Sequence, residues 1–286
     1  MLSAHSLPAK KQLIACLISL LFISSLSAKP FTGTIEAIDI ETRTLTLKSD
    51  SDEKSIQAGV GSGDIAIAKP GRRISGELIP QGKSLRLEHI FPADPEKTAI
   101  LAQMSANLKQ DTLRRGNRVF RSVGERIPDF ALWDQNGNLF LSESLRGKYW
   151  IVNFVFTRCT MAEMCSAATS RMIELDHLLD AEKVDDVAFV SITLDPEYDT
   201  PGIWTAYAED RGIDASRHFL LGGPPESVQF LKKQLGVLSE SDPTQIIKHT
   251  MSTALVDPNG KIIYRLPGSR WDPQIFIKRI QRDRKK

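Results

Sequence analysis

The sequence predicts a mixed α/β domain preceded by a small all-β domain, with a helix joining the two. Three observations support this arrangement. Short alternating strands interrupted by glycines fill residues 30–92, apolar residues recur at helical spacing in residues 93–123, and buried strands alternate with helices in residues 124–282. A chain of 286 residues that is 41% hydrophobic and 25% charged has the balance of an ordinary globular protein with one or two domains.

An export signal is predicted in residues 1–28. A polar start carrying Lys10 and Lys11 leads into an apolar run over residues 13–26 and then into small residues. This run is shorter than the roughly 20 residues that cross a bilayer as a helix, so cleavage is favoured over a permanent anchor. We interpret Cys16 as a residue of the signal that is lost if the signal is cleaved. We expect the rest of the chain to be periplasmic, either free or held at the membrane by an uncleaved signal.

The all-β domain is predicted from four short runs of alternating apolar residues. The expected strands are residues 31–40, 44–48, 73–79 and 84–90. Glycines break the pattern between the runs, which indicates a small barrel or sandwich. The linking helix is expected over residues 94–115, where Pro95 suits the first helical turn.

The α/β domain is predicted from nearly unbroken apolar strands followed by helical spacing. The expected strands are residues 149–156, 187–194 and 219–222, and the expected helices are residues 167–179, 202–211 and 225–235. A β-hairpin closes the domain, because residues 254–256 and 261–265 flank a turn at Asp257–Gly260. Strands without alternation are typical of a sheet that is buried on both faces.

The charge balance argues against nucleic acid as a partner. Lys and Arg number 37 against 35 Asp and Glu, and removing Lys10 and Lys11 with the signal leaves 35 against 35. A nucleic-acid surface therefore lacks its main electrostatic support. The C-terminal residues 278–286 are basic and are expected to form a solvated helix face or tail, with weak attraction to anionic lipid or an acidic partner as the alternative.

Two cysteines, Cys159 and Cys165, remain after the signal, and they follow the first strand of the α/β domain. A pair in an exported chain forms a structural disulfide in the simplest interpretation. Chemistry is the alternative, because a strand-to-helix loop is held by a rigid sheet and a helix start offers donors that stabilise a thiolate.

The α/β domain resembles the SCO/SenC family within the thioredoxin superfamily. The motifs that carry this resemblance are residues 127–130 (IPDF), 153–159 (NFVFTRC), 191–197 (SITLDPE) with 199–201 (DTP), and 248–250 (KHT) ahead of 255–260 (LVDPNG). The resemblance implies a thioredoxin-like fold, and it implies a copper site in which two cysteines and one histidine hold a single Cu(I) or Cu(II) ion. The matching positions are Cys159, Cys165 and His249, and Asp195 matches an aspartate near that site.

The donor types agree with this implication. Cu(I) is a soft ion that prefers thiolate sulfur and imidazole nitrogen, so two cysteines and a histidine suit it. The same thiols could instead close a disulfide, which would make copper loading depend on the redox state.

The cysteine loop departs from the family pattern. Five residues separate the cysteines instead of the usual three, and Thr160 and Ser166 stand where prolines commonly follow each cysteine. Three thioethers, those of Met161, Met164 and Met251, are close in sequence to the expected ligands. We interpret them as packing residues, with assistance to Cu(I) as the alternative.

Three other functions compete with copper binding at the cysteine pair. A thiol-disulfide oxidoreductase would normally have two residues between its cysteines and a proline before the hairpin strand, and residues 250–254 contain no proline. A peroxidase would need a threonine three positions before its cysteine, whereas Thr157 is two positions before Cys159. Redox signalling to a partner through the disulfide is the third.

The all-β domain more faintly resembles small OB-like copper-binding domains that are fused to some SCO-like proteins. Residues 54–70 contain no His, Met, Trp or Cys, and His89 is interpreted as a half-buried structural residue. We therefore expect this domain to dock or space and to bind no copper. For the whole protein, the resemblance implies a metallochaperone more than an enzyme. Its partner would be the copper-accepting subunit of a respiratory oxidase or another exported thiol protein.

Overall fold

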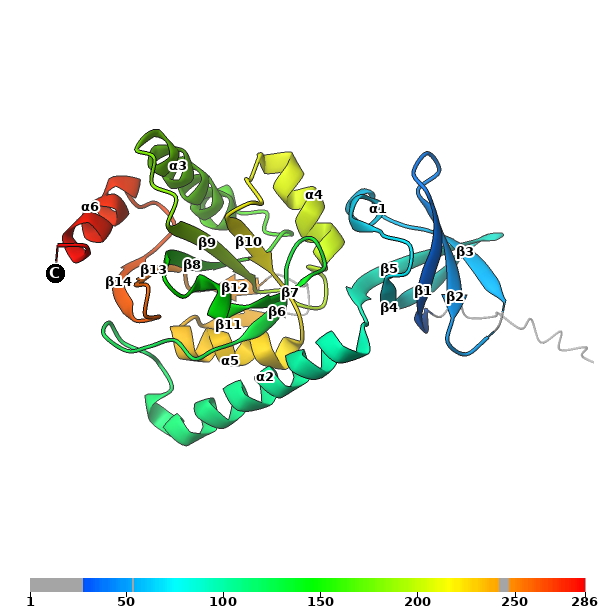
Figure 1. Cartoon of the computed structure of the whole chain (residues 1–286), viewed down its shortest axis with the longest axis horizontal. Coiled ribbons are helices and arrows are strands. Elements are labelled where there is room, and N and C mark those ends of the chain that lie inside the picture. Colours follow the sequence, from blue (N-terminus) through cyan, green and yellow to red (C-terminus); the bar gives the residue numbers. More distant parts are fainter. Residues whose placement is uncertain (1–27, 53, 242–246, 286) are drawn as a thin grey trace, which may run out of the picture.

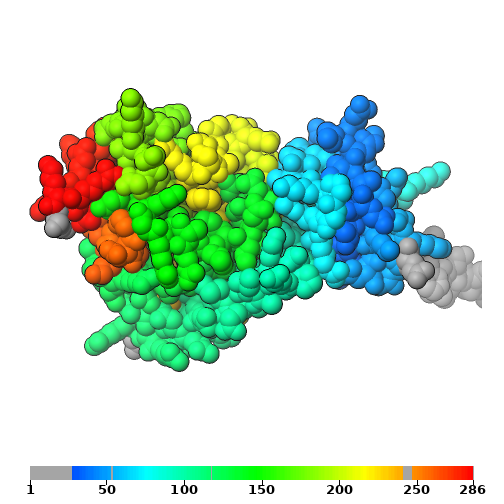
Figure 2. All heavy atoms as spheres, viewed as in Figure 1, coloured from blue at the N-terminus to red at the C-terminus, as the bar shows by residue number. Residues whose placement is uncertain are grey.

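The computed structural model describes residues 28–52, 54–241 and 247–285, in which an all-β barrel packs against a larger α/β domain (Figures 1 and 2). The predicted export signal lies outside the described residues except for Ala28. Within the part of the chain that the structure describes, no helix combines the length and apolar character needed to cross a membrane. The expected fold class, a small barrel followed by an α/β domain, is confirmed.

The N-terminal domain is a closed five-stranded barrel. Its strands are β1 (Lys29–Asp39), β2 (Thr44–Ser49), β3 (Ser55–Gly59), β4 (Arg73–Gln81) and β5 (Ser84–Pro92), in the order β1-β2-β3-β5-β4. Alternate residues point inward, so that Leu45, Leu47 and Leu87 fill the interior. Sequence reasoning missed β3 and the short helix α1 (Ser62–Ile67), because this stretch is rich in glycine and serine and lacks clear alternation.

Helix α2 (Pro95–Arg115) connects the two domains and packs along the second one (Figure 1). The side chain of Asp94 accepts a hydrogen bond from the backbone N–H of Lys97 at 3.1 Å and so caps the helix start. Leu108 is buried in the main core of the α/β domain, and Lys109 pairs with Glu226 on the neighbouring helix. The helix is therefore part of the body of the second domain as well as a connection.

A five-stranded sheet in the order β10-β9-β8-β13-β14 forms the centre of the α/β domain. Its strands are β8 (Tyr149–Val155), β9 (Val187–Thr193), β10 (His218–Leu221), β13 (Ser252–Val256) and β14 (Ile262–Pro267). The first three run parallel and the last two form the antiparallel hairpin expected from the turn at Asp257–Gly260. Two smaller ribbons accompany the sheet, β6 (Ala131–Trp133) with β7 (Leu139–Leu141) and β11 (Ser239–Ser241) with β12 (Ile247–His249).

Helices cover both faces of this sheet, which explains the unbroken apolar strands. They are α3 (Ala167–Ala181), α4 (Pro201–Arg211), α5 (Pro225–Leu235) and α6 (Pro273–Asp283). Alternate residues of β8 enter different cores: Ile151 packs with α3 and α6, whereas Val152 and Phe154 pack with α4 and α5. Of the basic C-terminal stretch, Lys278, Arg279 and Arg282 lie on the exposed face of α6, whose opposite side buries Phe276 and Ile280.

Candidate metal centre

The expected ligands come from three separate elements at one edge of the sheet. Cys159 lies in the loop after β8, Cys165 lies in a π-helical turn (Ala162–Ser166) that leads into α3, and His249 ends β12. Parallel strands place the loops that follow them at a common edge, and functional groups collect there. The π-helical turn holds part of the five-residue segment between the cysteines, and such turns are frequent at functional sites.

The structure brings these three residues together. One donor atom from each of Cys159, Cys165 and His249 lies within 4.8 Å of the other two. The Sγ of Cys165 is 3.5 Å from Nε2 of His249. Both cysteines are free thiols. Across the described residues, no other group of three His, Cys, Asp or Glu side chains comes together in this way. The five-residue spacing therefore still allows the two sulfurs and the imidazole to converge.

Hydrogen bonding orients the His249 ring. Its Nδ1 lies 3.2 Å from the carbonyl oxygen of Thr250, which can only accept, so Nδ1 carries the proton and Nε2 presents a lone pair to the cysteines. The edge of the ring packs against Phe156, with ring centroids 5.7 Å apart. Burial lowers the pKa of His249, with a smaller contribution from the positive charge of Lys232. A neutral imidazole is the form that binds a metal ion.

Burial sets the protonation of Cys165. This thiol is only 1% exposed, and burial raises its pKa well above the ordinary range, with Cys159 adding to the effect. The expectation that the helix start stabilises a thiolate is therefore wrong for Cys165, because loss of hydration outweighs the nearby backbone donors. A soft metal ion that replaces the thiol proton would remove this penalty.

Cys159 occupies the more open side of the site. It is partly exposed, and its thiol is 3.9 Å from the carbonyl oxygen of Met161. Of the three methionines near the ligands, Met161 is 56% exposed, whereas Met251 packs against the main core. The packing interpretation thus suits Met251, and Met161 sits at the surface beside Cys159.

The loop after β9 supports the residues that precede Cys159. Asp195 accepts two hydrogen bonds from the guanidinium of Arg158, at 2.9 and 2.6 Å, and Arg158 stacks over Tyr198 at 4.1 Å. Asp195, which the resemblance places near the site, therefore forms an ion pair with the residue directly before Cys159. The contact reaches the site through Arg158 and not directly.

Asp199 is a supporting residue to which sequence reasoning gave no role. Its carboxylate is fully buried and accepts hydrogen bonds from the backbone N–H and the hydroxyl of Thr157 and from the hydroxyl of Thr193. Burial raises the pKa of Asp199 to about 7. The residue stands inside a motif already noted at residues 199–201, and its function became visible only once the fold placed Thr157 beside it.

Soft donors of this kind fit copper. Two sulfurs and an imidazole nitrogen are the ligands that Cu(I) prefers, and no carboxylate of a described residue joins the cluster. The partial exposure of Cys159 leaves one side of the site open to a partner. The arrangement can therefore bind a soft metal ion or exchange electrons through its two thiols.

Comparisons with known proteins agree with this geometry. The family profile described as SCO1/SenC matches residues 121–283. A SCO2-like protein of Rickettsia felis is 31% identical over 140 residues, which cover 47% of this chain and 66% of that relative. A relative named for copper binding in Stutzerimonas stutzeri is 33% identical over 142 residues, covering 48% of this chain and 66% of the relative. The match therefore spans just under two thirds of the length of these curated relatives.

A solved structure shows the same fold. The crystal structure of a SCO1/SenC family lipoprotein from Bacillus anthracis superposes with a TM-score of 0.52 at 28% identity, covering 57% of this chain and 98% of that one. The barrel lies outside the family match, which begins at Arg121. The matched part is the thioredoxin-like domain that holds Cys159, Cys165 and His249, and the chain belongs to the SCO1/SenC family.

Proposed function

We propose that this protein is an exported copper-binding protein that carries one copper ion on Cys159, Cys165 and His249. It delivers that ion to the copper centre of a respiratory oxidase or keeps the cysteines of that centre reduced. The observation that carries the proposal is the convergence of three soft donor atoms within 4.8 Å. Membership of the SCO1/SenC family supports it, as does the relative that is named for copper binding.

The differing exposure of the ligands suggests how the copper cargo would be passed on. Cys159 is partly exposed, whereas Cys165 is buried and contacts His249. A partner thiolate would reach the copper from the open side and displace Cys159 first. His249 and Cys165 would release it afterwards, so that the ion keeps soft ligands throughout the exchange.

Thiol-disulfide exchange is the second candidate, because the two thiols lie within the same 4.8 Å cluster. In that reaction the reduced pair would give two electrons and two protons to an oxidised cysteine pair of the partner. Cys159 and Cys165 would become a disulfide while the partner disulfide becomes two thiols. The partly exposed Cys159 would attack first through a mixed disulfide, and Cys165 would resolve it.

A competition titration separates the two candidates. The reduced full chain is titrated anaerobically with Cu(I) against a chromophoric chelator, alongside Cys159→Ser, Cys165→Ser and His249→Ala. We expect one tightly bound copper per chain and weaker binding in all three variants. If the reduced chain fails to compete for Cu(I) while its thiols titrate normally and form a reversible disulfide, copper delivery is excluded and the redox function stands.

A further inference from the structure

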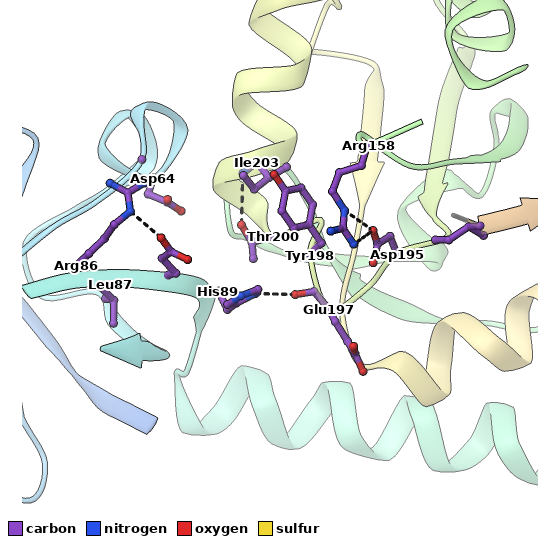
Figure 3. Close-up of a pocket in the computed structure, with 13 residues that line it drawn as sticks. Asp64, Arg86, Leu87, His89, Arg158, Asp195, Glu197, Tyr198, Thr200 and Ile203 are labelled. Carbon is purple, nitrogen blue, oxygen red and sulfur yellow. Dashed lines mark hydrogen bonds and ion pairs between the residues drawn. The ribbon is translucent and has the colours of Figure 1, made fainter. Parts of the chain in front are cut away.

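A cavity between the barrel and the α/β domain is lined in part by Arg158, the residue before Cys159, and is not explained by copper binding (Figure 3). It has a volume of about 590 Å³. Arg86 and His89 line it from the barrel, and Arg158, Asp195 and Glu197 line it from the α/β domain. The barrel therefore reaches the loop that supports the residues before Cys159.

A β-bulge in β5 directs the side chain of His89 toward the α/β domain. Ser75 pairs with Phe91 and Glu77 pairs with Glu88, so His89 and Ile90 of β5 together face the single residue Gly76 of β4. The backbone of His89 has a φ of +53°, a conformation that residues other than glycine rarely adopt. Strained residues of this kind persist where the surrounding structure requires them.

His89 is exposed and not half-buried as expected from the sequence, because its side chain leaves the barrel and forms a hydrogen bond to the other domain. Its Nδ1 lies 2.8 Å from the carbonyl oxygen of Glu197, which can only accept, so Nδ1–H donates (Figure 3). Glu197 lies between Asp195 and Asp199, the two carboxylates that bond Arg158 and Thr157. One barrel side chain is thus fixed to the loop that orders both residues directly before Cys159.

A glycine contact fixes the same loop from its other end. Gly63 of α1 packs so closely on α4 that a Cβ atom at Gly63 would lie 1.8 Å from the carbonyl oxygen of Gly202. Gly202 is in the first turn of α4, directly after the loop of residues 195–200. Neither backbone can move away without separating α1 from α4, so the barrel contacts the loop at Glu197 and the first turn of the following helix at Gly202.

We propose that the barrel holds the metal centre in position, and that His89 and Gly63 are the positioning residues. They act through residues 195–200, which hold Arg158 and Thr157 and thereby set the position of Cys159. The inference deepens the proposed function and rests on it for its copper readout. The barrel needs no copper ligand of its own for this role.

Two variants with matched controls test this in the full chain. His89→Gly removes the hydrogen bond, and glycine adopts the positive φ of this position without strain. Arg43→Gly is its control, because it relieves a similar φ of +52° at an exposed position of the barrel. Gly63→Ala forces α1 away from α4, and Gly59→Ala is its control, because a Cβ there would meet its nearest neighbour at 3.9 Å.

The expected result is loss of order at the metal centre without loss of the barrel. His89→Gly should weaken Cu(I) binding about fivefold, the size of one net hydrogen bond, and Gly63→Ala should weaken it by at least as much. The Cys159–Cys165 disulfide should become less stable against a thiol buffer by a similar factor, and amides in residues 195–200 should exchange faster. Both controls should match the wild type.

The proposal is overturned if His89→Gly leaves both copper affinity and the dithiol–disulfide equilibrium within twofold of the wild type. His89→Gly decides the question even if Gly63→Ala does not fold. If the wild type itself binds no Cu(I), the proposed function fails, and the dithiol–disulfide equilibrium of the same variants still decides this inference.

Discussion

The two domains of this protein place their chemistry in different ways. The α/β domain brings Cys159, Cys165 and His249 together from three elements at one edge of its sheet. The barrel contains a single histidine, His89, and no cysteine, methionine or tryptophan in residues 29–92. The loops that follow parallel strands all lie at the same end of a sheet and can meet at one site. The turns of a barrel built of hairpins are spread over its surface. We therefore expect the barrel to contribute through contacts and not through ligands.

The largest expected effect is on copper content, and it tests whether the ligands lie in the α/β domain alone. Cys165→Ser should lower Cu(I) affinity by more than about a hundredfold, since even residues behind the ligands typically cost ten- to a hundredfold. The copper content of the purified full chain, measured by metal analysis, should fall from one ion per chain to none. Two copper ions per wild-type chain would contradict the assignment, because the barrel would then hold a site of its own.

Stability should also differ between the domains when a carboxylate is removed. Asp199→Ala leaves the buried donors of Thr157 and Thr193 without their acceptor, and should cost about 4 kcal/mol in urea unfolding. Asp50 of the barrel pairs with Arg73 at the surface, so Asp50→Ala should cost less than about 1 kcal/mol. Equal losses of unfolding free energy from both substitutions would show that the hydrogen bonds of Asp199 stabilise the protein no more than a surface ion pair does.

Asp64, on the barrel side of the domain boundary, should add a pH dependence to stability. Burial raises its pKa from 3.8 to about 6, and its Oδ1 has no hydrogen-bond partner. The folded protein therefore binds a proton more tightly than the unfolded chain does, and stability falls as pH rises from about 4 to 6. The loss should be at most ~3 kcal/mol.

Asp64→Asn should remove that part of the slope, while the contribution of Asp199, whose pKa is raised to about 7, remains. Urea unfolding of both proteins between pH 4 and 7 measures the difference. If the stability of Asp64→Asn changes with pH in parallel with that of the wild type, the charged form of Asp64 is not destabilised by burial.

The smallest expected effect concerns Met161, the exposed thioether beside Cys159. Met161→Leu keeps the size and apolar character of the side chain. If Met161 packs on the cysteine loop and does not bind copper, Cu(I) affinity should stay within about twofold of the wild type. Met251→Leu serves as the half-buried counterpart. A tenfold weaker complex with Met161→Leu alone would add a thioether to the ligand set.

The fold class and the cluster of Cys159, Cys165 and His249 could be predicted from sequence, because short sequence patterns mark the buried strands and the family motifs. The apolar run of β8 identified a strand buried on both faces, and the motifs around Cys159 and His249 identified the family. Asp199 and His89 could not be assigned in this way. Their partners, Thr157 and Glu197, are 42 and 108 residues distant in sequence, and only the folded chain brings them together.

The protonation of Cys165 was also beyond local reasoning. Its position at a helix start predicted a stabilised thiolate, whereas the folded protein buries the thiol and raises its pKa. Burial depends on packing contributed by distant elements, so a sequence pattern near the cysteine does not report it. The same reason explains why the barrel bulge at His89 could not be foreseen from its strand.

The most direct test of the metal centre is X-ray absorption at the copper edge on the Cu(I)-loaded full chain. The structure predicts two sulfur neighbours and one imidazole nitrogen, with the imidazole signal absent in His249→Ala. A wild-type spectrum that shows sulfur neighbours only, unchanged by His249→Ala, would contradict the assignment of Cys159, Cys165 and His249 as the ligands.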